Sequence, residues 1–171
     1  MSNRFESRQR AVNSSRMALW LVLLFSGVGV AVASYLVTLH AAIAHNPRRG
    51  LCTFTDTISC DAVLASPYAE IAGVPVALIG VAGFAALGIL AAVCLFIPWW
   101  GPCRMRVTLL LVASVGLGFE LVMTGVEIFI LRAVCPYCLM ALGLIASAFL
   151  SACWAWRREE TIPMRPEADH A

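Results

Sequence analysis

Apolar residues dominate four long stretches of the chain, and polar residues fill the segments between them. A helix needs about 20 mainly apolar residues to span a bilayer, and each stretch comes close to that length or exceeds it. The pattern therefore predicts four transmembrane helices. We place them at residues 17–43, 74–97, 107–131 and 138–156.

Small residues recur within the predicted spans, as Gly80 and Gly83 do in the second one. Small side chains allow membrane helices to approach one another closely. We therefore expect an all-α membrane protein, a four-helix bundle over residues 17–156. Tails at residues 1–16 and 157–171 flank this bundle.

The longest connection, residues 44–73, contains two helix signals. Residues 61–65 favour a short helical turn. Ser66 followed by Pro67 is typical of a helix start, with serine as the N-cap and proline at the first helical position. We expect this second short helix to end at Gly73 and to lie at the bilayer surface, where it would cap the bundle.

The composition supports a membrane protein. The 171 residues are 61% hydrophobic and 13% charged, whereas soluble domains have about 45–50% apolar and about 25% charged residues. The spans leave no room for a separate soluble domain. A net charge of +2 without a basic patch argues against nucleic-acid binding.

Arginine supplies all twelve basic residues, and most lie in the two tails and in the connection after the second span. Basic residues favour the cytoplasmic side, so both termini are predicted to be cytoplasmic. Loop 44–73 and the start of the fourth span then face the periplasm of a bacterium, with the protein in its inner membrane. Ala31-Val32-Ala33 also fits a signal-peptide cleavage site, but hydrophobicity that continues to Ile43 favours an uncleaved span.

Four of the seven cysteines form two pairs on the predicted outer side. Cys52 and Cys60 lie in the long loop, and Cys135 and Cys138 form a CPYC motif that opens the fourth span. Disulfides form and persist in such an oxidising compartment. Lone cysteines in apolar runs behave as small hydrophobes, which is our expectation for the other three, Cys94, Cys103 and Cys153.

The CPYC motif is placed to be reactive. Pro136 suits the first helical position, which puts Cys135 at the N-cap and Cys138 in the first turn. A helix N-terminus carries roughly half a positive charge, and CxxC cysteines at such a site have lowered pKa values. We expect Cys135, nearer to water, to be attacked by incoming thiolates, and Cys138 to face the bundle interior.

Each pair also admits a structural explanation. A CPYC disulfide would pin the start of the helix, and a Cys52–Cys60 disulfide would staple the loop. A zinc site formed by all four cysteines is disfavoured, because seven residues separate Cys52 from Cys60 and no histidine accompanies CPYC; we expect no metal. A dithiol in a loop beside a fixed dithiol instead favours stepwise thiol–disulfide exchange.

The electron acceptor follows by elimination. The sequence carries no flavin, haem or nucleotide motif, which leaves a quinone in the bilayer that reaches Cys138 between the helices. Ser66 is a candidate donor to a quinone oxygen, although the local pattern explains it as an N-cap alone. Intramembrane carboxylates are functional candidates. Glu120 is a candidate proton relay, whereas Glu127, near Arg132, is expected to be paired or solvated.

Together these residues resemble the vitamin K epoxide reductase family in its bacterial form. The resemblance covers the four-span core and implies a helix bundle around a quinone, ubiquinone or menaquinone. It implies that Cys135 and Cys138 are the active-site CxxC, that Cys52 and Cys60 are the shuttle pair of the loop, and that Ser66 lies beside the quinone. The residues that carry it are Cys52, Cys60, Asp61-Ala62-Val63-Leu64-Ala65-Ser66-Pro67-Tyr68, Gly73-Val74-Pro75 and Cys135-Pro136-Tyr137-Cys138.

The resemblance also implies a route for the electrons. Cys52 exchanges with a thioredoxin-like partner, Cys60 attacks Cys135, and the released Cys138 thiolate reduces the quinone. The short tail after the fourth span leads us to expect a separate, DsbA-like partner in place of a fused thioredoxin-like domain. Leu142 stands where the animal enzymes have tyrosine, which argues against vitamin K epoxide reduction of the animal type.

The leading hypothesis is a quinone-linked thiol oxidoreductase that generates disulfides. The alternatives are a quinone or vitamin K epoxide reductase whose purpose is quinol, and a non-enzymatic membrane scaffold with structural disulfides. Thiol oxidases of the DsbB type also have four spans and two cysteine pairs. Their CxxC lies in the first outer loop, however, and the order here is reversed.

Overall fold

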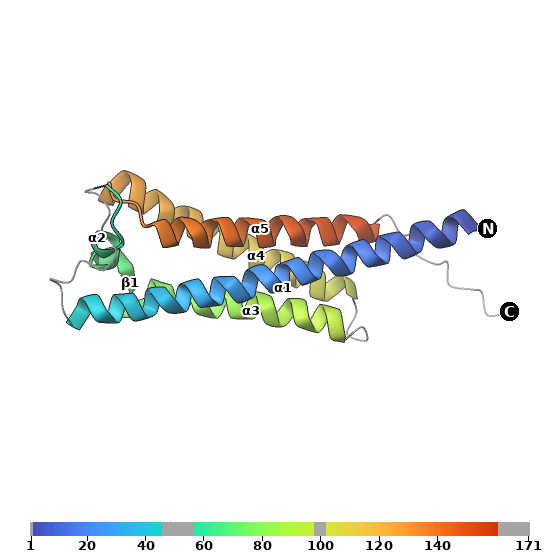
Figure 1. Ribbon diagram of the computed structural model, residues 1–171, viewed down its shortest axis with the longest axis horizontal. Coiled ribbons are helices and arrows are strands. Elements are labelled where there is room, and N and C mark those ends of the chain that lie inside the picture. Colours follow the sequence, from blue (N-terminus) through green and yellow to red (C-terminus); the bar gives the residue numbers. More distant parts are fainter. Residues whose placement is uncertain (1, 46–56, 98–101, 161–171) are drawn as a thin grey trace.

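Four long helices form the body of the protein (Figure 1). The computed structural model describes residues 2–45, 57–97 and 102–160. The long helices are α1 (Ser2–His45), α3 (Val76–Phe96), α4 (Pro102–Val126) and α5 (Pro136–Glu160). Between α1 and α3 lie the short helix α2 (Cys60–Leu64), the 3-10 turn η1 (Pro67–Ala69) and the strands β1 (Glu70–Ile71) and β2 (Val74–Pro75). A π-helix, η2 (Glu127–Leu131), continues α4.

The long helices pack as a closed bundle. Helix α1 packs against α3 and α5, and α4 completes the ring by packing on the same two helices. Within the described ranges, four helices are long and apolar enough to cross a membrane, which confirms the predicted all-α, four-span bundle of a multi-pass membrane protein. These spans are Asn13–His45, Val76–Phe96, Met105–Leu131 and Pro136–Arg157. Helix α1 begins earlier than its predicted span, because the helix continues through the polar tail from Ser2.

Large apolar side chains face both the interior and the outside of the bundle. Leu19, Leu87 and Leu109 are buried in its core, whereas Leu111 and Val115 are exposed on α4. A helix of a soluble bundle keeps its outer face polar. Apolar side chains on both faces are what a lipid environment requires, because lipid solvates the outer ones.

A close contact between α1 and α3 depends on the absence of a side chain at Gly29. A Cβ atom built at Gly29 would overlap the ring of Phe84. The glycine therefore lets the Phe84 ring lie directly against the α1 backbone, where the ring is almost fully buried. Phe84 is important for the site, because it forms part of two cavities described below.

The closing segment, residues 57–75 before α3, lies across one end of the bundle, at the left in Figure 1. The predicted turn at 61–65 is present as α2. Ser59 caps it, because its hydroxyl oxygen accepts a hydrogen bond from the Ala62 N–H at 3.2 Å. Val63 and Leu64 on α2 are buried beside Leu39 of α1, so the short helix is packed onto the bundle.

The prediction of a second short helix from Ser66 to Gly73 is wrong beyond the first turn. Pro67 does begin a helical turn, but η1 is a 3-10 turn of three residues. The chain then forms an antiparallel hairpin of β1 and β2. Ala72 and Gly73 have φ angles of 52° and 78°, and two successive left-handed residues favour a tight hairpin turn over a helix.

A second irregular segment joins α4 to α5. The π-helix η2 ends at Arg132, which adopts a left-handed conformation with φ 52°. The backbone carbonyl of Glu127 accepts hydrogen bonds from the N–H groups of both Arg132 and Ala133. This helix end turns the chain sharply toward Cys135 and α5.

Candidate active site

Backbone pairing brings the loop cysteine Cys60 to the CPYC motif. Residues before α2 run parallel to residues before α5 and form a bridge between Ile58 and Val134. The Val134 N–H donates to the Thr57 carbonyl at 2.9 Å, and the Ser59 N–H donates to the Val134 carbonyl at 3.2 Å. Each strand segment is followed directly by a cysteine. The pairing therefore sets Cys60 beside Cys135, and the two sulfurs are hydrogen-bonded.

The CPYC motif occupies the predicted position at the start of α5. Pro136 is the first helical residue, and the Cys135 carbonyl accepts the first hydrogen bond of the helix, from the Leu139 N–H at 3.1 Å. Cys135 and Cys138 are free thiols, and their sulfurs are hydrogen-bonded to each other. One correction concerns exposure. Cys135, expected nearer to water, has an exposed fraction of 0%, because the Cys60 segment covers it.

The Cys135 thiol ionises more easily than an ordinary cysteine. The hydrogen bond from the Cys138 thiol is the main cause, and it lowers the pKa of Cys135 from 9.0 to about 7. Burial acts in the opposite direction, while the Cys138 N–H and the Cys60 thiol add further stabilisation of the thiolate. Near neutral pH a large fraction of Cys135 is therefore the thiolate, which is the nucleophilic form.

Glu127 contacts the CPYC motif directly, which the sequence did not predict. Its Oε2 atom accepts a hydrogen bond from the Cys135 N–H at 3.1 Å, and its carboxyl group is also hydrogen-bonded to the Cys138 thiol. The expected pairing with Arg132 or with solvent is wrong: in the described part of the chain Glu127 is 4% exposed and makes no salt bridge with Arg132. The only sequence signal was an acidic residue inside an apolar span.

Cys138 opens onto a cavity of about 80 Å³ inside the bundle. Ser66 and Tyr68 border it from the segment that closes the bundle, and the two carboxylates of the third span, Glu120 and Glu127, border it from α4 and η2. The structure thus brings Ser66, Cys138 and Glu120 to one cavity, although they lie far apart in the sequence.

A larger apolar cavity of about 380 Å³ adjoins the first. The two cavities share Gly80, Phe84 and Glu120 as wall residues, so they are neighbours within the bundle. The larger cavity is bordered by Leu111 and Val115, which are exposed on the outer surface of α4. Together the cavities provide an apolar path from the lipid-facing surface toward Cys138.

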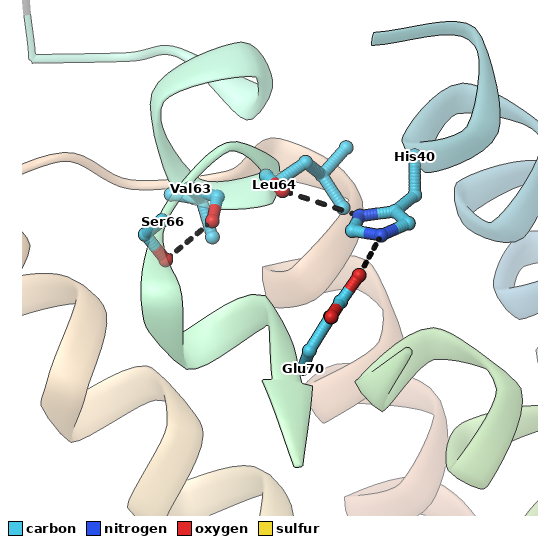
Figure 2. A network of polar contacts seen from close by, with 5 residues as sticks. All are labelled: His40, Val63, Leu64, Ser66 and Glu70. Atoms are coloured by element: carbon cyan, nitrogen blue, oxygen red, sulfur yellow. Dashed lines mark hydrogen bonds and ion pairs between the residues drawn. The ribbon is translucent and has the colours of Figure 1, made fainter. Parts of the chain in front are cut away.

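Polar contacts hold the closing segment over this path (Figure 2). Figure 2 shows the His40 ring of α1 between the Leu64 carbonyl, 3.2 Å from Nδ1, and the Glu70 carboxylate, 3.1 Å from Nε2. Because a carbonyl oxygen only accepts, Nδ1 is the donor to Leu64. The Ser66 hydroxyl donates to the Val63 carbonyl at 2.7 Å and makes no capping bond to η1.

The remaining cysteines are separate from this group. Cys52, the predicted partner of Cys60, lies outside the described residues. Cys94 and Cys153 lie in the helices α3 and α5, where they are half-buried, and Cys103 is near the start of α4. The cysteine group that the structure describes at this end of the bundle therefore consists of Cys60, Cys135 and Cys138.

These features define the class of protein: a membrane-spanning bundle with a buried CPYC dithiol at one end and an apolar path that leads to it. The chain matches the sequence profile of the Vitamin K epoxide reductase family over residues 20–153, and it belongs to that family. Membership implies thiol and quinone oxidoreductase activity, and the match reaches into all four spans and includes Cys60, Cys135 and Cys138.

Proposed function

We propose that the protein oxidises thiols at the expense of a membrane quinone and thereby generates disulfides for other proteins. The single observation that carries this proposal is the row of hydrogen-bonded sulfurs from Cys60 through Cys135 to Cys138, the last of which opens onto a cavity. A static staple would need only one pair. A row of three sulfurs supplies the nucleophile, the attacked sulfur and the leaving group that thiol–disulfide exchange requires.

Electrons enter from a thioredoxin-like, DsbA-like protein, whose thiolate attacks Cys52 of a Cys52–Cys60 disulfide and releases the Cys60 thiolate. The second thiol of that partner then displaces Cys52, which leaves the partner with a disulfide and Cys52 as a free thiolate. Cys60 then attacks Cys135 of the oxidised CPYC motif, which forms a Cys60–Cys135 bond and frees Cys138. Attack of Cys52 on Cys60 restores the loop disulfide and leaves Cys135 and Cys138 as a dithiol. That dithiol loses two electrons and two protons to a quinone, which becomes quinol, and the Cys135–Cys138 disulfide forms again.

The two cavities suit an acceptor with a polar ring and a long apolar tail, such as ubiquinone or menaquinone. The smaller cavity presents Ser66, Glu120 and Cys138 to the ring, and the larger one is lined almost entirely by carbon. Ser66 is the proposed donor to a quinone oxygen. Its hydroxyl proton is directed at the Val63 carbonyl, so this role requires the hydroxyl to rotate.

We place the protein in the cytoplasmic membrane of a bacterium, with the cysteine site on the periplasmic side. The closing segment and the start of α5 lie at one end of the bundle, and the beginning of α1 and the end of α5 lie at the other (Figure 1). Arg4, Arg8 and Arg10 at the start of α1 and Arg157 and Arg158 at the end of α5 lie at that other end, which supports its cytoplasmic location.

The test is quinone reduction by the purified protein in detergent, with a reduced DsbA-like protein as electron donor. We expect the Cys138→Ala variant to lose at least about 100-fold in rate, because no other group can replace the sulfur that reduces the quinone. The matched control is Cys153→Ala, a cysteine on the same helix, which should retain the wild-type rate. If the wild-type protein oxidises none of several such donors with any quinone, the proposed function is wrong.

A further inference from the structure

The electron route leaves one proton without an assigned acceptor. When Cys135 acts as the thiolate, the Cys138 thiol must still lose its own proton before the disulfide can form. The Cys138 thiol is hydrogen-bonded to two groups, the Cys135 sulfur and the Glu127 carboxyl group. Since the Cys135 sulfur becomes part of the new S–S bond, Glu127 is the acceptor that remains.

Glu127 also has access to the place where the proton is needed. Its side chain lines the same small cavity as Cys138, and quinol formation consumes protons at the two oxygens of the ring. At the same time its Oε2 atom accepts the Cys135 N–H. This bond and the bonds to its backbone carbonyl hold Glu127 at the turn that leads into α5.

We propose that Glu127 is a catalytic residue that takes the thiol proton of Cys138 and passes it to the quinone. This inference rests on the proposed function and adds the proton route to it. As the S–S bond between Cys135 and Cys138 forms, two electrons pass to the quinone, and the Cys138 proton moves to the Glu127 carboxylate. Glu127 then protonates one quinol oxygen. The second quinol proton comes from water, to which Cys135 lost its own proton when it ionised.

The surroundings of Glu127 favour this assignment over other titratable groups. Cys135 and Cys138 face it from the start of α5, and Cys60 of α2 lies behind Cys135. Glu120, which lies earlier in the same span on α4, also borders the cavity. Helix α3 contributes no acidic or basic side chain. Glu127 is hydrogen-bonded to both cysteines of the CPYC motif, so it can take the Cys138 proton directly.

The decisive comparison is between Glu127→Gln and Glu127→Ala. Glutamine keeps an oxygen that can accept the Cys135 N–H but cannot take a proton, whereas alanine removes both functions. We expect Glu127→Gln to slow single-turnover oxidation of the reduced protein by quinone about 100-fold, within the usual range for loss of a general acid–base group. Glu127→Asp keeps the carboxyl group and should recover part of the rate that the Gln variant loses.

The matched control is Glu159→Gln near the far end of α5, roughly 30 Å along the helix from Cys138 at 1.5 Å per residue. It should react at the wild-type rate. If Glu127→Gln also reacts at that rate, the carboxylate only anchors the Cys135 N–H, and the proposal is overturned. The thermal midpoint of each purified variant shows whether a slow variant is simply unfolded.

A second measurement needs no quinone. Oxidation of the dithiol by a small soluble disulfide should produce a protonated-carboxyl band in the infrared difference spectrum of the wild-type protein. The band should vanish in Glu127→Gln and persist in Glu159→Gln. A wild-type spectrum without this band overturns the proposal. A wild type that gives the band but cannot reduce quinone supports Glu127 as the proton acceptor and refutes the proposed electron acceptor instead.

Discussion

At the residue scale, the ionisation of the Cys135 thiol depends on the hydrogen bonds that its sulfur receives from neighbouring thiols. It is buried, and burial alone would disfavour its charge, but the Cys138 thiol donates a hydrogen bond to it. The balance favours the thiolate near neutral pH. A thiolate at a sulfur without exposed surface is thus stabilised by the second cysteine of the motif, which acts as the hydrogen-bond donor.

This balance can be measured by ultraviolet titration of the thiolate in the reduced protein. The absorbance step assigned to Cys135, identified by its loss in Cys135→Ala, should have a midpoint at about pH 7. Because the thiolate is the reactive form, reoxidation of the dithiol should slow as the pH falls below that value. In Cys138→Ala the main stabilising hydrogen bond is gone, so the midpoint should move to higher pH. An unchanged midpoint would contradict the assigned cause.

A second prediction at the residue scale concerns Gly29. In Gly29→Ala the new methyl group would overlap the Phe84 ring, and forcing an extra methyl group into a packed core costs about 1–3 kcal/mol. We expect a lower thermal midpoint and, because Phe84 borders both cavities, weaker quinone reduction. Gly27→Ala is the matched control, since a Cβ atom there meets open space; it should leave both properties unchanged.

At the element scale, the site is assembled by a short parallel pairing between the segments that precede α2 and α5. Replacing Val134 by proline removes the N–H group that donates to Thr57. In a background with both Cys52→Ala and Cys138→Ala, no cysteine of either pair is left to release Cys60 from Cys135. A mild oxidant should then convert the Cys60 and Cys135 thiols into a Cys60–Cys135 disulfide when the wild-type pairing is intact. Adding Val134→Pro should reduce that disulfide several-fold, whereas adding Val134→Ala, which keeps the N–H, should not.

The same element explains what sequence reasoning could and could not find. Pro136 and the apolar run after it are local signals, so the position of Cys135 at the start of a helix was predictable. The burial of Cys135 was not, because it depends on a bridge between Ile58 and Val134, which lie far apart in the chain. Likewise, the hairpin after Ser66 depends on a left-handed conformation at Ala72. Alanine rarely adopts this conformation, so the sequence did not predict it.

The role of Glu127 was also beyond reach of the sequence. Its proximity to Arg132 suggested an ion pair, yet Arg132 is the left-handed residue at which η2 ends, and the carboxylate turns to Cys135 instead. By contrast, the four spans were predicted well, because each depends only on the length and composition of one segment. Local patterns fixed the elements, and contacts between distant segments assembled the site.

At the scale of the whole molecule, the larger cavity links the site to the lipid. Gly83 borders this cavity, and a side chain there would meet open space. Gly83→Leu should therefore fill part of the cavity without disturbing the fold. If the tail of the quinone lies there, kcat/KM should fall about tenfold for a long-tailed quinone and change little for a tail-less one.

Gly118→Leu is the matched control on α4. A side chain at Gly118 also meets open space, but Gly118 does not line the larger cavity. Its kcat/KM should match the wild type for both quinones. An equal loss for the tail-less and long-tailed quinones in Gly83→Leu would mean that the tail follows another route.

The burial of Cys60 and Cys135 shields their sulfurs from direct contact with small molecules in solution. Bare sulfurs at a membrane surface would let any small thiol in the surrounding fluid discharge the quinone pool to no purpose. Sulfurs with no exposed surface exchange slowly with small thiols and disulfides, and faster with a protein donor that can engage the closing segment itself. Burial therefore provides substrate selectivity. Thiol–disulfide exchange by itself does not distinguish one thiol from another, and the fold favours those donors that can reach the sulfurs.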